Sequence, residues 1–328
     1  NFLLPDFHLF KIHYRIAIHT FKMYRQNKIP VMLMAFIRPD LLKKCLQHLE
    51  KFAPPILYVM GDGPRNEKEA ALCEQSRELA LSPGWKCEVI RIFNDQNEGI
   101  VKSFIKGMNL MFSDHEYGIY LEDDIMLSPS FYQFAHELLI KYKDEPKIGH
   151  INATNAAPHY RNPEDSSYHF GNYITEWGFA TWRRVWESYD INMSEWEKIN
   201  KNKILRKSTF NSRSKNSLKQ MFDLHCNNPS PLAWGYQWHF NCLKNNYLSI
   251  TPACNMSLNL GFEREDSTNT FGENPIANQL DEAEFPLLHP SEIKPNESFD
   301  RLVENTICPS YTKVFIGKLF NRIKSLRL

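Results

Sequence analysis

The chain has 328 residues, 42% of them hydrophobic and 23% charged, which is the composition of a globular protein with one large domain or two smaller ones. A formal net charge of +1 argues against nucleic-acid binding as the main function, because such proteins carry a basic excess. The seven cysteines are odd in number and include no C-x-x-C pair, which argues against a disulfide framework or zinc site and predicts reduced thiols in a cytoplasmic protein.

The first half of the chain begins with a basic segment and continues with alternating strand and helix patterns. Residues 1–28 mix apolar and basic positions at helical spacing, and we predict a basic amphipathic helix there. From residue 29, we predict strands at 29–37, 55–63, 87–93, 117–125 and 147–154, and helices at 39–52, 66–82, 100–114 and 129–144. This alternation predicts an α/β fold with a Rossmann-like, mainly parallel central sheet flanked by helices, which binds ligands beyond the carboxyl ends of its strands.

The alternation stops after residue 155. Residues 156–300 are rich in Trp, Asn, Pro and Tyr, with one amphipathic stretch near residues 214–226, and we predict that this half shapes a second substrate site. Residues 301–328 form a basic amphipathic tail whose apolar stripe contains Phe315, Leu319, Ile323 and Leu326. Such a helix either lies on an anionic membrane surface, here the inner face of the plasma membrane, or docks on the domain with its basic side in water.

Three adjacent carboxylates, Glu122, Asp123 and Asp124, end the fourth predicted strand. Like charges this close repel one another unless a cation neutralises them. Hard oxygen ligands at the binding edge of a sheet favour Mg²⁺ or Mn²⁺, which keeps open positions for phosphate oxygens. A solvated acidic turn is the alternative interpretation.

Two other strand ends carry polar residues toward the same edge. Arg38 follows the first strand, where it could hold a phosphate, and Asp62 ends the second, where it could accept hydrogen bonds from a base or ribose. Each alone is ordinary turn chemistry, but the three strand ends together are more specific. The sequence contains neither G-x-G-x-x-G after the first strand nor G-x-x-x-x-G-K-[ST], which argues against dinucleotide-binding and P-loop proteins.

In this order, the motifs resemble sugar-nucleotide-dependent glycosyltransferases of the GT-A fold. The resemblance spans roughly residues 30–275 and is carried by AFIRPDLLKKCL, GDGPR, NEGIVKSFIKGMN and YLEDDIMLSPSFYQFAHELLIKY. A closer likeness is to bacterial transferases with the signature W-G-W-A-T-W-R-R, which stands here as WGFATWRR from Trp177 to Arg184. A more distant likeness is to N-acetylglucosaminyltransferase I, which also carries E-D-D.

The resemblance implies roles for particular residues. Asp124 would bind the metal ion. The nucleotide sugar would contact residues at the strand ends and the following loops: Arg38, Asp62, Asn97, Gly99, Lys102, Glu122 and Asp123. The sugar or acceptor would stack on aromatic rings, for which core packing is the alternative role: Trp177, Trp182 and Trp234.

Two positions depart from the family pattern. Gly235 stands where the related proteins usually carry an Asp, a plausible base for the acceptor hydroxyl, and Asn269 stands where a His is expected. Either another carboxylate is the base, or the chemistry is impaired. The candidate bases are Glu176, Glu263 and Asp266.

The resemblance therefore implies a metal-dependent glycosyltransferase that moves a hexose or N-acetylhexosamine from a nucleotide donor, UDP before GDP, with inversion. The acceptor would be a glycan or lipid-linked glycan in bacterial surface polysaccharide biosynthesis. Two other classes stay open. A sugar-1-phosphate nucleotidyltransferase would carry a Gly-rich basic loop after the first strand, which AFIRPD is not. A glycan- or nucleotide-binding protein with an impaired site is the other.

Overall fold

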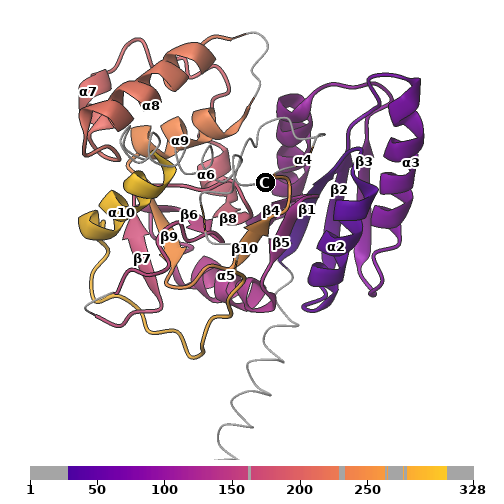
Figure 1. Cartoon of the computed structure of the whole chain (residues 1–328), viewed down its shortest axis with the longest axis horizontal. Coiled ribbons are helices and arrows are strands. Elements are labelled where there is room, and N and C mark those ends of the chain that lie inside the picture. Colours follow the sequence, from indigo (N-terminus) through magenta and orange to yellow (C-terminus); the bar gives the residue numbers. More distant parts are fainter. Residues whose placement is uncertain are drawn as a thin grey trace, which may run out of the picture.

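The computed structural model describes residues 29–161, 164–228, 233–262, 264, 276 and 279–308. The helix predicted at 1–28 and most of the predicted basic tail, residues 309–328, lie outside these ranges. In Figure 1, the early elements (indigo and purple) and the later ones (pink to yellow) are arranged around one continuous sheet.

Eight strands form this central sheet, in the order β3-β2-β1-β4-β8-β6-β9-β7. They are β1 (Pro30–Ala35), β2 (Ile56–Gly61), β3 (Glu88–Phe93), β4 (Tyr117–Glu122), β6 (Ile148–Asn152), β7 (Tyr168–Gly171), β8 (Phe179–Trp182) and β9 (Leu248–Pro252). Six of them run in one direction, while β7 and β8 run in the other. The predicted α/β fold with a mainly parallel central sheet is confirmed. The sheet is continuous across the predicted halves 29–155 and 156–300.

Helices cover both faces of the first four strands. They are α2 (Pro39–Glu50), α3 (Glu67–Leu81) and α4 (Ile100–Asp114), whereas α5 (Pro129–Lys141), which follows β4, packs on β8. The connections through α2 and α3 step toward one edge of the sheet, whereas the connection through α4 crosses back past β1. Because such crossovers are right-handed, α2 and α3 pack together on one face and α4 packs on the other.

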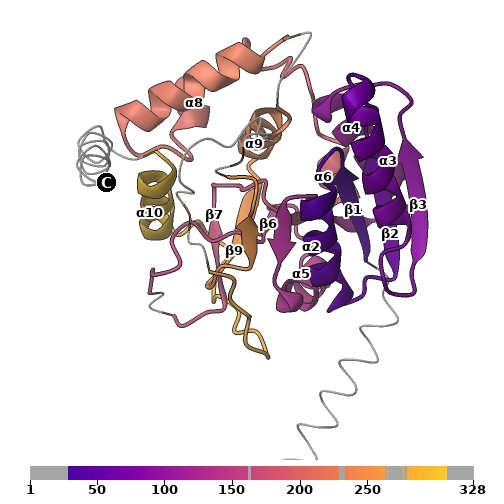
Figure 2. The same ribbon diagram turned by 45° about the vertical axis from the view of Figure 1, so that its right-hand side comes forward.

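The second half adds a helical layer at one end of the sheet. Its helices are α6 (Arg183–Trp186), α7 (Lys201–Leu205), α8 (Ser212–His225), α9 (Gly235–Lys244) and α10 (Glu297–Ile307). Helices α7, α8 and α9 pack on one another around a small core that contains Met193, Trp196 and Phe222. In Figure 2, α8 lies across the top of the molecule above α9. The amphipathic stretch predicted near 214–226 is α8.

The fourth strand ends earlier than predicted, at Glu122, and Asp123 and Asp124 form a turn. The chain then enters β5 (Ile125–Leu127), which pairs antiparallel with β10 (Ser257–Asn259). In an extended strand, consecutive side chains point to opposite faces, so the turn is what allows both Asp side chains to meet one partner. Among the described helices, none has the length and apolar character of a membrane span.

Candidate active site

The strand register brings the predicted loops together. β1 pairs in parallel with both β2 and β4, with Ala35 opposite Gly61 and Met34 opposite Glu122. All three strands therefore end at the same edge of the sheet, the edge where α/β proteins bind ligands. The loops that begin there carry Arg38, Asp62, Asp123 and Asp124.

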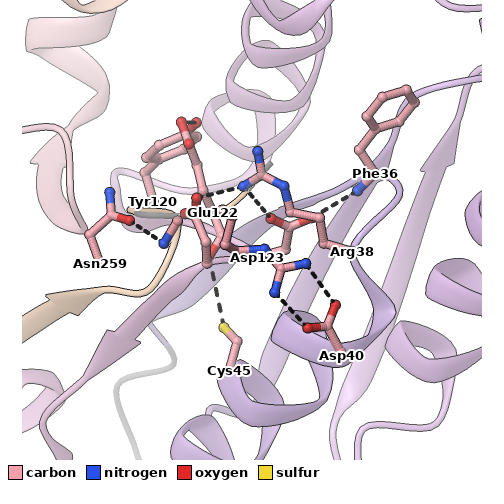
Figure 3. A network of polar contacts seen from close by, with 11 residues as sticks. Phe36, Arg38, Asp40, Cys45, Tyr120, Glu122, Asp123 and Asn259 are labelled. Atoms are coloured by element: carbon pink, nitrogen blue, oxygen red, sulfur yellow. Dashed lines mark hydrogen bonds and ion pairs between the residues drawn. The ribbon is translucent and has the colours of Figure 1, made fainter. Parts of the chain in front are cut away.

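The loop after β1 holds the acidic turn after β4 (Figure 3). The backbone N–H of Phe36 donates to Oδ2 of Asp123 at 3.1 Å, and Nη1 of Arg38 donates to Oδ2 of Asp124 at 2.7 Å. The same Nη1 lies 3.9 Å from Oδ1 of Asp123. Asp123 and Asp124 are only 7% and 6% exposed, which excludes a solvated acidic turn. The Arg38 guanidinium neutralises both carboxylates where little water screens them.

One oxygen of Asp124 has no partner. Oδ1 is buried and accepts no hydrogen bond from the described residues, whereas Oδ2 is held by Arg38. Burial raises the pKa of Asp124, and the charge of Arg38 opposes this shift. An unsatisfied buried acceptor is costly, so this oxygen is poised for a cation.

Asp124 thus fits the metal-binding role expected of it. The described residues contain no group of three or more potential ligands that would enclose a metal ion. A nucleotide-bound Mg²⁺ does not need one, because it is held by one or two carboxylates together with waters and phosphate oxygens. Oδ1 of Asp124 can supply such a ligand while Oδ2 remains bonded to Arg38.

A second arginine borders the acidic turn. Arg264 pairs with Asp40, with Nη1 2.8 Å from Oδ2, and its charge also lowers the pKa of Asp124. Gly261 packs so tightly here that an added Cβ would overlap Oδ2 of Asp124. The Gly261 N–H donates to Oδ1 of Asn259 at 2.7 Å, which fixes this approach. The acidic turn is therefore enclosed from two sides by segments far apart in the sequence.

Glu122 differs from its two neighbours in its surroundings. The Tyr120 hydroxyl donates to its Oε1 at 2.7 Å. Burial, together with the charges of Asp124, Asp123 and Glu176, raises the pKa of Glu122 to about 8, although the Tyr120 hydrogen bond opposes this shift. The Arg38 guanidinium lies beside Asp123 and Asp124.

Asp62 organises the loop that follows β3. Its carboxylate accepts five hydrogen bonds at 2.9–3.0 Å, from the backbone N–H groups of Gly63, Glu98 and Gly99 and the side-chain amides of Asn94 and Asn97. A carboxylate has about four lone-pair positions, so these donors fill its capacity. They leave no acceptor for the base or ribose contact expected from the sequence.

The same loop leads into the N-terminus of α4. Gly99 has a φ of 85°, a conformation that favours glycine, and an added Cβ would meet nothing within 4 Å. Lys102 is exposed in the first turn of α4. Open space, a helix N-terminus and a lysine together suit an anionic group such as a phosphate.

Glu176 is the candidate base that the structure describes, and it lies against the start of α9. An added Cβ at Gly235 would overlap the Glu176 carboxylate. Glu176 is reached by solvent, yet protein surrounds it closely enough that desolvation raises its pKa to about 7. Its charge also raises the pKa values of Glu122 and Tyr236, which places it in the same electrostatic environment as the acidic turn. The other two candidates, Glu263 and Asp266, lie outside the described residues, as does Asn269.

Trp182 and Trp234 are core residues, which corrects the expectation that they stack on sugars. Trp182 is 2% exposed and donates from Nε1 to the Leu139 carbonyl at 3.0 Å. Trp234 is 3% exposed and stacks on Phe104 with ring centroids 4.1 Å apart. Trp177 is half-buried and keeps accessible surface beside Phe262, so it can meet a ligand.

Sequence reasoning missed Asn94, Arg77 and Arg264. Asn94 is 2% exposed, donates to Asp62 and accepts from Nζ of Lys106. Arg77 donates to the backbone carbonyls of Asp62 at 3.2 Å and Asn94 at 2.6 Å. The rule applied to the other strand ends would have found Asn94, which directly follows β3. No local pattern marks Arg77 or Arg264, because both act across long stretches of chain.

Solved structures similar to this chain include glycosyltransferases and a nucleotidyl-transferring enzyme. The mannosyltransferase PcManGT from Pyrobaculum calidifontis, in complex with GDP-Man and Mn²⁺, has 9% identity and a TM-score of 0.37, over 69% of this chain and 76% of that one. Mouse xyloside xylosyltransferase 1 has 11% identity and a TM-score of 0.33, over 67% and 83%. The 4-diphosphocytidyl-2C-methyl-D-erythritol synthase from Anaerococcus prevotii has 10% identity and a TM-score of 0.32, over 65% and 96%. The sequence matches no protein-family profile and no curated protein.

Proposed function

We propose that the protein is a glycosyltransferase that binds a nucleotide sugar at the carboxyl edge of its sheet and transfers the sugar to a glycan or lipid-linked acceptor. The observation that carries this proposal is the pair formed by Arg38 and Asp124. One oxygen of Asp124 is bonded to the guanidinium, and the other is buried and unsatisfied. A purely structural ion pair would not leave a buried oxygen unpaired, whereas a cation and a guanidinium side by side suit a diphosphate.

The donor would lie across the loops at the sheet edge. Asp124 would hold Mg²⁺ or Mn²⁺ through Oδ1, and the ion, when bound, supplies Lewis-acid stabilisation of the leaving diphosphate. Arg38 and Lys102 would bind phosphate oxygens, together with the N-terminus of α4. Asp123 would accept a hydrogen bond from a hydroxyl of the ribose or donor sugar. UDP is the nucleotide we propose first, with GDP second.

Asp62 would act through the loop after β3. Its five hydrogen bonds hold Asn97 and Gly99 in place at the entrance to α4. We therefore assign Asp62 a positioning role, in place of the direct nucleotide contact expected from the sequence. Asn97 and Gly99 keep the expected place near the diphosphate, since they lie at the start of the helix that would receive it.

Glu176 would remove the proton from the acceptor hydroxyl. The acceptor oxygen then forms a bond to the anomeric carbon, the bond from that carbon to the diphosphate oxygen breaks, and the diphosphate leaves with the electron pair. A single displacement of this kind inverts the anomeric centre. A pKa of about 7 suits a general base that works near neutral pH, and the described residues place no hydrogen-bond donor on this carboxylate.

The second half of the chain would bind the acceptor. Trp177 has accessible surface that could stack on a sugar ring next to Glu176. Residues 29–155 would then be the donor half and 156–300 the acceptor half. A cytoplasmic role at the inner membrane face in bacterial surface polysaccharide synthesis belongs to the same proposal.

The proposal is tested by incubating the protein with a panel of UDP- and GDP-sugars, with Mn²⁺ or with EDTA. Release of nucleoside diphosphate, dependent on the metal ion and stimulated by glycan acceptors, is the expected result. If nucleotides bind but no donor is turned over by the wild type, the protein is a nucleotide-binding protein with an impaired site. Release of pyrophosphate from a nucleoside triphosphate and a sugar phosphate would identify a nucleotidyltransferase instead.

A further inference from the structure

The stretch of residues 201–219, which the proposed function does not use, forms a strongly basic surface. It covers α7, the following loop and the first half of α8. The stretch contains no Asp or Glu and seven cations: Lys201, Lys203, Arg206, Lys207, Arg213, Lys215 and Lys219. A local excess of this size, in a chain whose formal net charge is +1, indicates an anionic partner.

A hollow of about 190 Å³ opens in this surface. Its lining consists of Arg206, Thr209, Phe210, Asn211, Ser212 and Lys215. Within the described part of the chain, neither Arg206 nor Lys215 forms an ion pair. Lys201 and Lys219 of the same stretch are by contrast both paired with Asp223, at 3.2 Å and 2.5 Å. Arg206 and Lys215, which line the hollow, are thus among the cations of this stretch that no carboxylate of the described residues neutralises.

The hollow also contains the N-terminus of α8. The side chain of Asn211 caps this helix by accepting from the Ser214 N–H at 2.9 Å. The N–H of Ser212, the first residue of α8, has no acceptor among the described residues. A helix N-terminus with free N–H groups carries partial positive charge and attracts anions.

Phe210, in the lining of the hollow, also contacts α10. The guanidinium of Arg301 lies 4.3 Å from the ring centroid of Phe210 and is paired with Glu297, with Nη2 3.9 Å from Oε2. The carboxylate of Glu304 accepts the Phe210 N–H at 2.9 Å and is 2% exposed, so it faces a backbone donor and not the surface of the hollow.

We propose that this hollow is a phosphate-binding site. The Thr209 hydroxyl already donates to the Leu205 carbonyl, which leaves a guanidinium, an ammonium, a free helix N–H and the Ser212 hydroxyl at the hollow. These are donors that a phosphate group recruits in proteins. The site is separate from the sheet edge. The C-terminal end of α8 lies beside the start of α9, where the ring of His225 is 4.8 Å from that of Tyr236. The hollow lies at the other end of α8, a helix length of roughly 20 Å away. The inference therefore does not rest on the proposed transferase function.

The test is isothermal titration of the full chain with inorganic phosphate, in buffers matched in ionic strength with sodium chloride. The double variant Arg206→Gln/Lys215→Gln removes the two cations of the hollow. Lys198→Gln/Lys203→Gln removes two exposed cations outside it and is the matched control, because it changes the net charge equally. We expect the first variant to weaken phosphate binding by about tenfold or more and the control to bind as the wild type does.

Equal weakening in both double variants would show that phosphate responds only to diffuse charge, and would overturn the proposal. Absence of phosphate binding in the wild type would overturn it as well. Vesicles of phosphatidylcholine with and without phosphatidylglycerol then identify the source of the phosphate. Binding that needs phosphatidylglycerol and is weakened by Arg206→Gln/Lys215→Gln, but not by the control, assigns the site to a lipid headgroup. Phosphate binding with no such vesicle effect assigns it to a soluble phosphate-bearing ligand.

Discussion

The carboxylate of Glu176 occupies the space that a side chain on residue 235 would need. Gly235 is the first residue of α9, so its lack of a side chain is what lets Glu176 lie against the helix end. Glu176 is solvent-accessible, has a pKa raised to about 7 by desolvation, and influences Glu122 across the site. A free carboxylate at this place is a candidate base in a chain whose position 235 cannot provide one.

Replacement of this carboxylate should remove catalysis and spare donor binding. We expect Glu176→Gln to lower kcat by roughly 10²–10⁴-fold, because a general base contributes about that much. Nucleotide affinity should change little, since Glu176 would face the acceptor. Steady-state kinetics and nucleotide titration of the variant check both. Glu187→Gln, which changes an exposed carboxylate directly after α6, is the matched control. Unchanged kcat in Glu176→Gln would exclude it as the base.

A side chain at position 235 should act through Glu176. Gly235→Ala would overlap the Glu176 carboxylate and displace it, so we expect kcat to fall at least about tenfold with the Michaelis constant for the donor nearly unchanged. The double variant Glu176→Gln/Gly235→Ala should be little worse than Glu176→Gln alone, because residues that act as a unit are not additive. Independent, multiplying losses would show that Gly235→Ala acts by another route. Thermal unfolding of each variant separates this effect from loss of folding.

The pH profile should report the same carboxylate. A base works only when deprotonated, so kcat should rise with pH and level off above about 7, the pKa to which desolvation by the surrounding protein raises Glu176. Rates measured from about pH 5 to pH 9 would show this limb, and the residual activity of Glu176→Gln should lack it. A limb that persists in the variant would belong to another group.

Much of the fold follows from the local sequence. The helix predicted at residues 100–114 has the observed bounds Ile100–Asp114, because Gly99 precedes it and its apolar positions repeat at helical spacing. The alternation of strands and helices predicted the parallel sheet. The strand predicted at 117–125 was too long, because its end depends on Arg38, a partner in another loop.

The site could be predicted only where it depends on strand ends. Arg38, Asp123 and Asp124 meet because β1 and β4 are neighbours in the sheet. The alternating pattern predicts that both strands end at the same edge, but it does not predict that they are adjacent. The role of Asp62 could not be read from its turn, since four of its five donors come from residues more than 30 positions later in the chain. The contact between Glu176 and Gly235 likewise joins distant segments, and no periodicity signals it.

Asp62 should stabilise the loop that follows β3. We expect Asp62→Asn to destabilise the protein by about 1–3 kcal/mol, because an amide oxygen and a surplus N–H₂ group replace an acceptor of five hydrogen bonds. Nucleotide affinity should fall as well, because the entrance to α4 loosens. Denaturant unfolding and nucleotide titration measure the two effects. Asp95→Asn, exposed in the same loop, should change neither. If Asp62→Asn has normal stability but no longer binds the nucleotide, Asp62 contacts the nucleotide directly and the positioning role is wrong.

The central claim is that Asp124, oriented by Arg38, belongs to a metal–diphosphate site. The measurement that tests it most directly is thermal stabilisation by UDP and GDP, each with and without Mn²⁺, on the wild type and on Asp124→Ala. We predict that one nucleotide raises Tm in the presence of Mn²⁺, by an amount that grows with its concentration, and that Asp124→Ala abolishes this rise. No stabilisation of the wild type by any nucleotide, or equal stabilisation of the variant, would contradict the account.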